Sequence, residues 1–306
     1  MFVALTGATG FVGTHVAQRL LRRDHDLRIL TRSPERAGWL RDRGVEVVGG
    51  DLGDQGALRA LVAGADAVVH LVGIIVEAGR QTFERVHLGG TRNVVAASRE
   101  AGVSRFAHMS ALGARPSAEA TTYHRTKAAA EDVVRSSGLS HVILRPSLIA
   151  APDNAVIKML LDLLRLSPFV PVIGDGKYQL QPVAVDDVAE AFAVALEKPG
   201  IQGTYDIAGP DVLTYHQLLD QLEQALGVKR RRVPVPVGVV RFAANAGTAL
   251  PNLNPITPDQ LTMLLEGNTT ASNALEGVFG VSPRRFADVA REVCEPYAAK
   301  AGVGEG

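Results

Sequence analysis

Short runs of apolar residues alternate with amphipathic stretches through the first half of the chain. The runs predict β-strands, and the stretches between them repeat apolar positions every three or four residues, as α-helices do. Strands are expected at Phe2–Thr6, Leu27–Thr31, Val45–Val48, Ala67–Val72, Arg105–Met109 and His141–Leu144. Helices are expected at Phe11–Arg23, Pro34–Asp42, Asp54–Val62, Glu84–Ala101 and Tyr123–Ser137. Apolar strands separated by helices indicate an α/β fold with a doubly wound parallel sheet, the Rossmann type, whose ligands bind beyond the carboxyl ends of the strands.

This rhythm changes after Pro146. Helices are expected at Val156–Leu166 and Val188–Glu197, a strand at Thr204–Ala208, and a loop at Ser167–Gly176, which is rich in proline and glycine. We predict a dinucleotide-binding domain over 1–150 and a small C-terminal α/β lobe on the substrate side over 151–306, partly interleaved with the first domain.

An apolar stretch flanked by prolines runs from Val233 to Pro255. Its part up to Leu250 is interrupted by Arg241 and Asn245 and is too short to cross a bilayer. Three interpretations stay open: the stretch packs into the core of the second lobe, lines a tunnel for a lipid-like substrate, or rests on a membrane surface.

Three glycines at intervals of three, Gly7, Gly10 and Gly13, follow the first strand and open the first helix. Such a turn lets the backbone approach a pyrophosphate, and the helix N-terminus supplies free N–H groups and a partial positive charge. The third glycine allows the helix to pack closely on the sheet. The other residues of this turn that we expect to contact the dinucleotide are Thr9, Phe11 and Val12.

The residue after the second strand distinguishes NAD from NADP. An acidic side chain there would bind the ribose 2′-hydroxyl, but this chain has Thr31 and Arg32. A guanidinium suits a 2′-phosphate, so NADP(H) is the expected cofactor. Asp51, after the third strand, could accept a hydrogen bond from the adenine amino group with Leu52 packed on the ring, or it could cap a turn; both can hold at once.

Composition and charge exclude several classes of protein. Lys+Arg and Asp+Glu both number 32, and the isoelectric point is about 7.1, so general nucleic-acid binding is not expected. The single cysteine, Cys294, excludes an internal disulfide and a CxxC metal site, and the histidines lack metal-binding spacing. No Gly-x-Ser-x-Gly motif supports a hydrolase. The apolar run at the N-terminus lacks a basic flank, so we expect a cytoplasmic protein, with peripheral contact at the inner membrane as the alternative.

Several motifs together carry a resemblance to a known family. TGATGFVG, GGDL, HLVG and YHRTK resemble the extended or atypical branch of the short-chain dehydrogenase/reductase superfamily, in the order in which they occur here. Six further motifs narrow the resemblance to one branch of this superfamily: FERVHLGGTRNVV, MSALGA, LRPSLI, VIGDGKYQLQPVAVDDVAEAF, DIAGPDVLTY and PITPDQLTMLLEGN. Together they resemble bacterial relatives of the nucleotide-binding accessory subunit of respiratory complex I, the alpha-subcomplex subunit 9 family, over nearly the whole chain.

The resemblance implies a Rossmann domain that holds NADPH, and it implies roles for three residues. Tyr123 would exchange a proton with the carbonyl oxygen, Lys127 would lower the pKa of that phenol and bind the nicotinamide ribose, and Ser110 would hydrogen-bond the substrate oxygen. Tyr123 and Lys127 are four residues apart, so they share a face of the expected helix. Further cofactor contacts are expected at Val72 and Gly73 of HLVG and at Pro146 of LRPSLI.

One departure from the superfamily affects the expected proton path. Many reductases of the superfamily carry an asparagine where this chain has His87. His87 could relay protons itself, because imidazole titrates near neutrality, or it could be a hydrogen-bonded structural histidine. His70, at the end of a strand, is expected to be structural.

Three functions remain open. The first is an NADP(H)-dependent oxidoreductase acting on a small or lipid-like carbonyl or alcohol, related to quinones in one version. The second is an NADPH-binding accessory or assembly protein without turnover. The third is a nucleotide-sugar epimerase or dehydratase, which uses the same three residues.

Overall fold

The computed structural model describes residues 1–247 and 256–298. The chain forms two compact units. Unit 1 comprises Met1–Pro146, Val185–Ile207 and Ser272–Ser282, and unit 2 comprises Ser147–Ala184, Ala208–Ala271 and the residues from Pro283 onward. The predicted domains, 1–150 and 151–306, are continuous segments, whereas each compact unit is made of several segments. The predicted boundary at residue 150 therefore stays a prediction.

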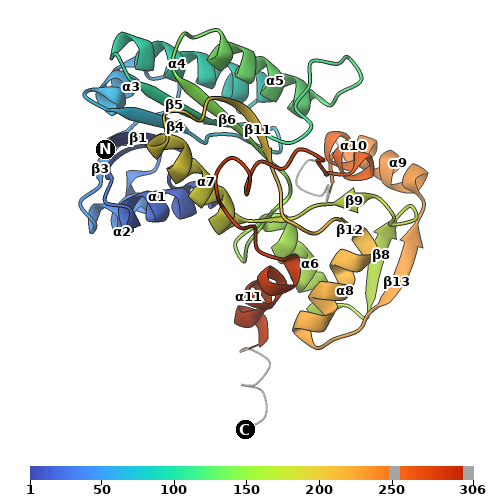
Figure 1. Ribbon diagram of the computed structural model, residues 1–306. Helices are drawn as coiled ribbons and strands as arrows, with labels where there is room; N and C mark the ends of the chain where they lie inside the picture. Colours follow the sequence, from blue (N-terminus) through green and yellow to red (C-terminus); the bar gives the residue numbers. More distant parts are fainter. Residues whose placement is uncertain (248–255, 299–306) are drawn as a thin grey trace. The chain divides into compact units, whose positions relative to one another are not determined.

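Unit 1 is built around a seven-stranded sheet with the strand order β11-β6-β5-β4-β1-β2-β3 (Figure 1). Every neighbouring pair is parallel. The strands are β1 (Phe2–Thr6), β2 (Asp26–Thr31), β3 (Glu46–Gly49), β4 (Ala67–His70), β5 (Arg105–Met109), β6 (His141–Pro146) and β11 (Gly203–Ile207). The order reverses between β1 and β4, so the predicted doubly wound α/β fold is confirmed.

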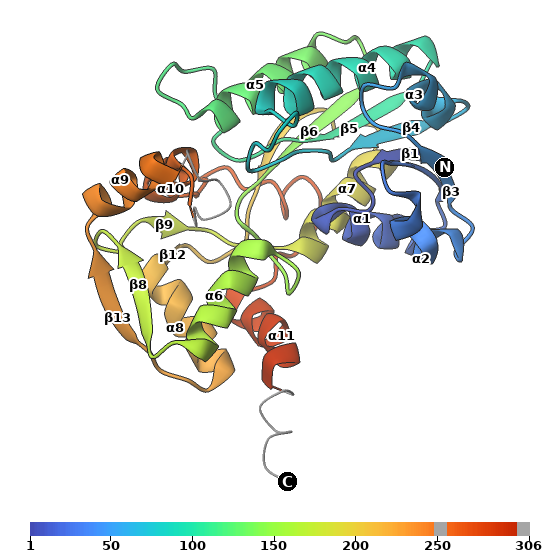
Figure 2. The same ribbon diagram turned by 180° about the vertical axis from the view of Figure 1, so that it is seen from behind.

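Helices cover both faces of this sheet. α3, α4 and α5 lie on one face, and α1, α2 and α7 lie on the other (Figures 1 and 2). Their bounds are α1 (Phe11–Arg22), α2 (Gly38–Arg41), α3 (Gln55–Val62), α4 (Gly90–Glu100), α5 (Thr122–Arg135) and α7 (Val185–Glu197). A 3₁₀ turn, Pro34–Ala37, precedes α2, and a π-helical segment, Glu84–Gly89, precedes α4. The predicted helix over Glu84–Ala101 therefore begins with a wider turn than the sequence pattern indicates, and the predicted strand Ala67–Val72 ends earlier, at His70.

Unit 2 combines helices with short two-stranded sheets. Its core is formed by apolar residues of α6, α8 and α11, among them Leu161, Leu219 and Val293, and it includes the buried Cys294. The helices are α6 (Ala155–Leu166), α8 (Tyr215–Leu226), α9 (Val237–Gly247), α10 (Pro258–Glu266) and α11 (Phe286–Ala298). The strands are β7 (Ile149–Ala150), β8 (Phe169–Ile173), β9 (Gln179–Leu180), β10 (Val183–Ala184), β12 (Leu213–Thr214) and β13 (Arg231–Val235).

The prediction of a loop over Ser167–Gly176 is wrong. β8 occupies its centre and pairs in parallel with β13, more than fifty residues further on. Val170 and Val172 of β8 are buried, while Phe169 and Pro171 point outward and are exposed. Pro171 is tolerated because each strand of a two-stranded sheet has a free edge, where a missing N–H disrupts no ladder.

The interpretation of Val233–Leu250 as core is also wrong for its described part. In α9 only Ala244 is buried among the residues up to Ala246, and Val239 and Phe242 are 58% and 77% exposed. Residues 248–250 lie outside the described part of the chain. Apolar composition alone did not distinguish a core segment from an exposed one.

Two histidine side chains on neighbouring strands of the sheet in unit 1 are fully buried. His70 of β4 and His108 of β5 are register partners whose rings stack, with centroids 5.4 Å apart. His70 Nδ1 lies 2.7 Å from Thr6 Oγ1, and its Nε2 lies 3.1 Å from Thr91 Oγ1. Burial, with the charge of Lys127 as a second cause, lowers the pKa of His70 to about 3. The pKa of His108 is lowered well below its usual value, again mainly by burial. Both rings are therefore neutral in the folded protein, in agreement with a structural role for His70.

This neutrality predicts acid sensitivity. The unfolded chain binds a proton at each of these histidines below about pH 6.5, whereas the folded protein does not, so the free energy of unfolding falls as the pH drops below that value. The His108→Phe variant should lose less stability than the wild type between pH 7 and pH 5, by roughly 2 kcal/mol. Urea unfolding at the two pH values measures the difference.

Phe106→Leu is the matched control for this measurement, because Phe106 is also fully buried in β5 and does not titrate. It should lower the stability equally at both pH values. An unchanged pH dependence in His108→Phe would contradict the assignment of a neutral buried imidazole.

Candidate functional site

The turn between β1 and α1 leaves no room for side chains. Gly7 has a φ of +83°, a conformation that favours glycine. The Gly10 N–H donates a hydrogen bond of 3.0 Å to the Gly7 carbonyl and closes the turn. A Cβ atom on Gly13 would lie 1.9 Å from the same carbonyl oxygen. Any side chain at that position would force α1 away from β1.

The N-terminus of α1 can receive an anion. Gly10 is its N-cap residue and offers no side-chain acceptor, and the first turn contains no acidic residue. The free N–H groups and the positive end of the helix dipole therefore have no competing partner from the cap or from an acid in that turn. Thr9 lies beside the end of β2, with its Oγ1 at 3.4 Å from that of Thr31. This geometry fits the pyrophosphate of a dinucleotide, with Phe11 and Val12 starting the helix behind it.

The loops after β2 and β3 hold the residues expected at the adenosine end. Arg32 directly follows β2 and is exposed, and no ion pair joins it to a described residue. Asp51 Oδ1 accepts a hydrogen bond of 2.7 Å from Gly53 N–H, so the turn-capping interpretation of Asp51 is confirmed. The adenine interpretation stays a prediction.

Leu52 is positioned by a residue that sequence reasoning missed. Asn93 Nδ2 of α4 donates a hydrogen bond of 2.7 Å to the Leu52 carbonyl. The Leu52 side chain packs on α4 at Gly90, where a Cβ atom would lie 2.5 Å from Leu52 Cδ1. A single asparagine within a helix gives no signal of this contact in the sequence.

The loop after β4 brings the glycine turn and α5 together. A Cβ atom on Gly7 would lie 3.2 Å from Val72 N, and one on Gly73 would lie 3.0 Å from Lys127 Nζ. The first contact joins the ends of β1 and β4, and the second joins the end of β4 to α5. These segments thus meet at the carboxyl edge of the sheet, where doubly wound proteins bind their ligands.

Lys127 is buried on α5, which begins at a Thr121 side-chain cap. Its Nζ donates a hydrogen bond of 3.0 Å to the Met109 carbonyl, directly before Ser110. Burial lowers the pKa of Lys127 to about 8, against an opposing effect of the Glu131 carboxylate. An ammonium has three donors, so this arrangement leaves Lys127 capacity for further acceptors.

Ser110 follows β5 at the same edge. Its N–H donates a hydrogen bond of 2.8 Å to the Leu144 carbonyl, and the neighbouring loop is held by Leu112 N–H, 3.0 Å from the Pro146 carbonyl. The Ser110 hydroxyl is buried and has no hydrogen-bond partner among the described residues. A buried hydroxyl without a partner is unfavourable, and a bound oxygen would relieve that cost.

Tyr123 lies one helical turn before Lys127 and is half-buried. Its ring contacts Phe83 and His87 edge to face, at centroid distances of 5.8 and 5.4 Å. Burial raises the pKa of the phenol to about 12. This direction is opposite to the one that the resemblance implies for the influence of Lys127.

His87 connects the loop after β4 to the helix that carries Tyr123. Its Nδ1 lies 2.9 Å from Thr126 Oγ1, and its Nε2 lies 3.2 Å from Ile74 N. The same Nε2 also lies 3.1 Å from the Ile74 carbonyl oxygen, so the ring has a partner on Thr126 and on the backbone of Ile74 in either neutral tautomer. Burial first, and then the charge of Lys127, lower the pKa of His87 to about 3. Such a ring does not accept a proton near neutral pH, which favours the structural interpretation of His87 over the relay.

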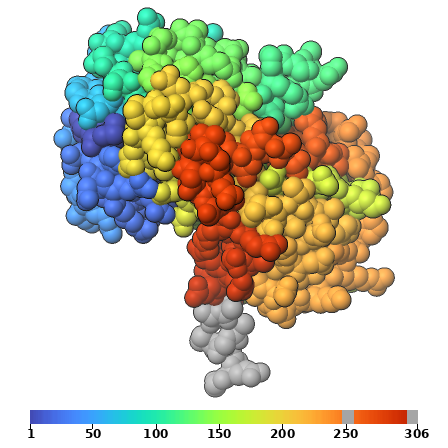
Figure 3. Space-filling view, in the orientation of Figure 1, coloured from blue at the N-terminus to red at the C-terminus, as the bar shows by residue number. Residues whose placement is uncertain are grey.

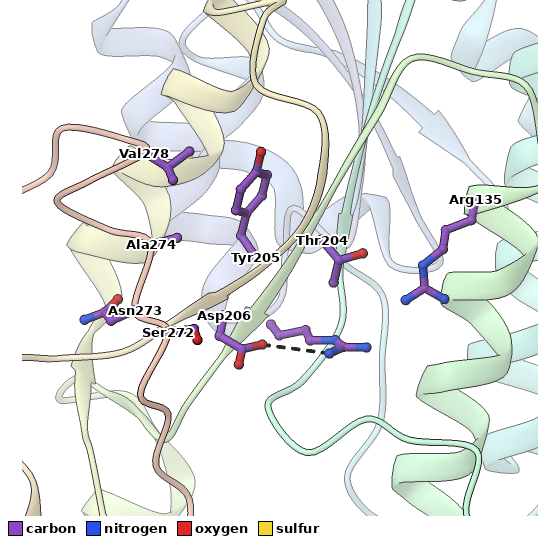
Figure 4. A pocket seen from close by; sticks show the side chains of 9 residues that line it. Arg135, Thr204, Tyr205, Asp206, Ser272, Asn273, Ala274 and Val278 are labelled. Atoms are coloured by element: carbon purple, nitrogen blue, oxygen red, sulfur yellow. Dashed lines mark ion pairs between the residues drawn. The ribbon is translucent and has the colours of Figure 1, made fainter.

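A separate cavity of about 630 Å³ lies along β6 and β11 and contains none of the predicted site residues (Figure 4). Arg145 lies 3.9 Å from Asp206 there and also binds the buried carboxylate of Glu131 at 2.7 and 2.6 Å. Its guanidinium is therefore already neutralised. The remaining lining residues are Arg135, Thr204, Tyr205, Ser272, Asn273, Ala274 and Val278.

Neither a metal-binding cluster nor a membrane-spanning helix occurs within residues 1–247 and 256–298. Within that part of the chain, no cluster of three or more His, Cys, Asp or Glu side chains could hold a metal ion. In the same part, every helix is too short or too polar to span a membrane.

Comparison with known proteins agrees with this geometry. The family model for NAD(P)H-binding proteins matches residues 7–199. A ceramide reductase from Caulobacter vibrioides is 34% identical over 237 residues, covering 76% of this chain and 73% of that protein. The alpha-subcomplex subunit 9 of mitochondrial NADH dehydrogenase from Arabidopsis thaliana is 28% identical over 286 residues, covering 88% and 71%.

Two further matches extend the range of relatives. The 4-hydroxy-2-methyl-3-oxo-4-farnesyl-3,4-dihydroquinoline-1-oxide ketoreductase of Stigmatella aurantiaca is 28% identical over 266 residues, covering 80% of this chain and 79% of that protein. The structure of the NADPH-dependent quinone oxidoreductase QOR2 from Escherichia coli, complexed with NADPH, superimposes with a TM-score of 0.77 at 22% identity, covering 97% of this chain and all of that one. At that identity the likeness concerns the fold alone.

The glycine turn, the sheet order and these matches agree: the chain belongs to the NAD(P)H-binding family, and reductases and the alpha-subcomplex subunit 9 of complex I are among its relatives.

Proposed function

We propose that the protein is an NADPH-dependent reductase of a ketone that carries a long hydrocarbon chain. The observation that carries this proposal is the buried Ser110 hydroxyl, which has no partner among the described residues and lies at the end of the strand whose last carbonyl binds Lys127. A carbonyl oxygen of the substrate would accept the hydrogen bond that this hydroxyl lacks.

Each residue of the site would have one task. A bound NADPH would supply the hydride, and Gly7, Gly10 and Gly13 would admit its pyrophosphate. Tyr123 would donate its phenolic proton to the oxygen of the ketone as negative charge develops there. With a pKa raised to about 12, the phenol is protonated at neutral pH, which suits reduction better than oxidation of an alcohol.

The loop after β4 supports an apolar substrate. Ile75 and Val76 are 53% and 43% exposed in unit 1, and the preceding Ile74 is bound to His87 through its backbone. This places exposed aliphatic side chains directly after Gly73, which faces Lys127. The ceramide and farnesyl-quinoline substrates in the names of two relatives also carry long hydrocarbon chains. A hydrocarbon chain packed on this loop would bury its apolar surface.

NADP in preference to NAD rests on Arg32. Its guanidinium is exposed after β2, where an acid would bind the 2′-hydroxyl of NAD. A 2′-phosphate would give Arg32 a charge-assisted hydrogen bond.

A second candidate function is an NADPH-binding accessory or assembly protein without turnover. The similarity to the alpha-subcomplex subunit 9, which extends over 88% of the chain, favours this candidate. The two functions differ in whether Tyr123 is needed. A nucleotide-sugar epimerase has the support of the fold alone.

The test of the reductase is the Tyr123→Phe variant. NADPH oxidation is followed with a panel of ketones, including long-chain 3-oxo esters, a 3-oxo sphingoid base and short-chain quinones. The variant should reduce the accepted ketone about 10²- to 10⁴-fold more slowly and bind NADPH with unchanged affinity, because only the proton donor is lost. Tyr205→Phe is the control, since the Tyr205 hydroxyl binds the Gln202 carbonyl outside the site. Absence of turnover across the panel would favour the accessory function, and full activity of Tyr123→Phe would show that the phenol is not the proton donor.

Cofactor preference is tested first on the purified protein. Denaturation should release NADP(H), identified by chromatography, or an empty site should bind NADPH more tightly than NADH. Arg32→Gln should weaken NADPH binding by roughly 1.5–3 kcal/mol, about 10- to 150-fold, with little effect on NADH. Arg41→Gln, at an exposed position of α2, is the matched control. A released NAD, or equal loss of both cofactors, would contradict the role of Arg32.

The pKa of Lys127 predicts the pH profile of the reaction. The ammonium form is needed to bind the ribose and to favour negative charge near Tyr123, and it is lost as the pH rises through about 8. The rate of reduction should therefore fall by up to roughly tenfold per pH unit above that value. Lys127→Arg should move the descending limb to higher pH, because arginine keeps its charge. A rate that stays constant to pH 10 in the wild type would remove Lys127 from the mechanism.

A further inference from the structure

One segment of unit 2 concentrates positive charge next to apolar side chains. Residues 229–246 contain Lys229, Arg230, Arg231, Arg232 and Arg241 and no Asp or Glu, in a chain whose formal net charge is zero. This segment includes β13 and most of α9, which reach the surface on the right-hand side of Figure 3. The charge of this segment is thus unlike that of the protein as a whole.

Two of these five cationic side chains form ion pairs or hydrogen bonds within unit 2, and the other three form no ion pair with a described residue. Arg232 forms ion pairs with Asp220 and Glu223 of α8, and Arg230 Nε donates to the Leu164 carbonyl. The other three side chains are exposed and form no ion pair within the described part of the chain: Lys229, Arg231 and Arg241. Their charges are available to an external partner.

α9 has apolar residues on two sides. Val237, Val240 and the buried Ala244 recur at helical spacing and form the less exposed side of the helix. Val239, Phe242 and Ala246 recur at the same spacing on another side and are exposed. A helix that is apolar on both sides is typical of a fully buried helix or of one that contacts lipid.

The outward face of β8 and β13 also exposes apolar side chains. In the parallel register Phe169 pairs with Arg231, and Pro171 pairs with Val233, and all four are exposed. The start of α9 packs against the end of β8, because a Cβ atom on Gly174 would lie 3.1 Å from Val237 Cγ2. We call Phe169, Val233, Val239 and Phe242, together with the three exposed cations, the basic apolar surface.

We propose that the basic apolar surface binds the surface of an anionic lipid bilayer. The cations would contact the lipid phosphates while Val239 and Phe242 enter the boundary of the acyl chains. α9 is about 16 Å long at 1.5 Å per residue, so it would lie in the interface and not cross the bilayer. A second copy of the chain is a poorer occupant, because a symmetric contact would place the cations of one copy against those of the other. The inference stands independently of the proposed reductase activity.

The test is flotation of the full chain with vesicles of phosphatidylcholine, with and without a quarter of phosphatidylglycerol. The wild type should float with the anionic vesicles at low salt, float weakly with neutral ones, and be released by 0.5 M salt, since the attraction between exposed charges is screened. Phe242→Asp and the double variant Arg231→Glu/Arg241→Glu should each lower the partition coefficient by about tenfold or more.

Matched controls separate this surface from general effects of charge. Val212→Asp changes another exposed apolar residue of unit 2, and Lys198→Glu reverses an exposed charge of unit 1; both should float as the wild type does. NADPH binding and the thermal unfolding transition verify folding, and Val239→Ser replaces Phe242→Asp if the latter does not fold.

Three results would overturn the proposal. The first is a wild type that does not float with anionic vesicles. The second is equal flotation of the wild type and the surface variants. The third is a concentration-dependent dimer, seen by light scattering, that Phe242→Asp abolishes in the absence of vesicle binding; it would assign the surface to contact between copies of the chain.

Discussion

The short distance between α1 and β1 is the constraint on which the site depends. With the Gly7 carbonyl 1.9 Å from the position of a Cβ atom on Gly13, the helix can start where it does only if that residue has no side chain. The same turn sets the position of the loop after β4 through the contact of Gly7 with Val72. A dinucleotide site at this edge therefore depends on glycine at positions 7 and 13. A larger residue at position 13 would overlap the backbone of the turn, and one at position 7 would crowd Val72.

A second constraint is the burial of one ammonium among neutral imidazoles. Lys127 contributes to the lowered pKa values of His70, His87 and His108, and burial is the larger cause for each of them. The histidines thus leave Lys127 as the only one of these four groups that can carry charge near neutral pH. In that setting the neutral His87 ring connects the loop after β4, at Ile74, to the helix that carries Tyr123, at Thr126.

The sequence predicted the parts of the protein that depend on local pattern. The apolar strands of the sheet, the glycine turn and the helix that carries Tyr123 and Lys127 all follow from periodicity and spacing within about twenty residues. It could not predict β8, because the partner of Phe169 is Arg231 and nothing near Phe169 indicates that pairing. It could not predict the Asn93 contact or the Ile74 bond to His87 for the same reason. The exposure of Val239 and Phe242 was not predicted, because the composition of an apolar run is the same whether the run is buried in the protein or exposed to solvent.

The interleaving of the two units has a consequence for the synthesis of the protein. The edge strand of the sheet in unit 1, β11, is formed by residues 203–207 and is therefore synthesised late. The segment that pairs with the outer edge of β11 is synthesised later still; its Ala274 N–H donates a hydrogen bond to the Asp206 carbonyl. A ribosome that has made the first 150 residues has therefore released the whole dinucleotide turn but leaves β6 as an unpaired edge, open to pairing with another nascent chain. The cofactor-binding unit can therefore be completed only when nearly the whole chain has been synthesised. A fragment that ends at residue 150 would lack β11, α7 and residues 272–282 of this unit.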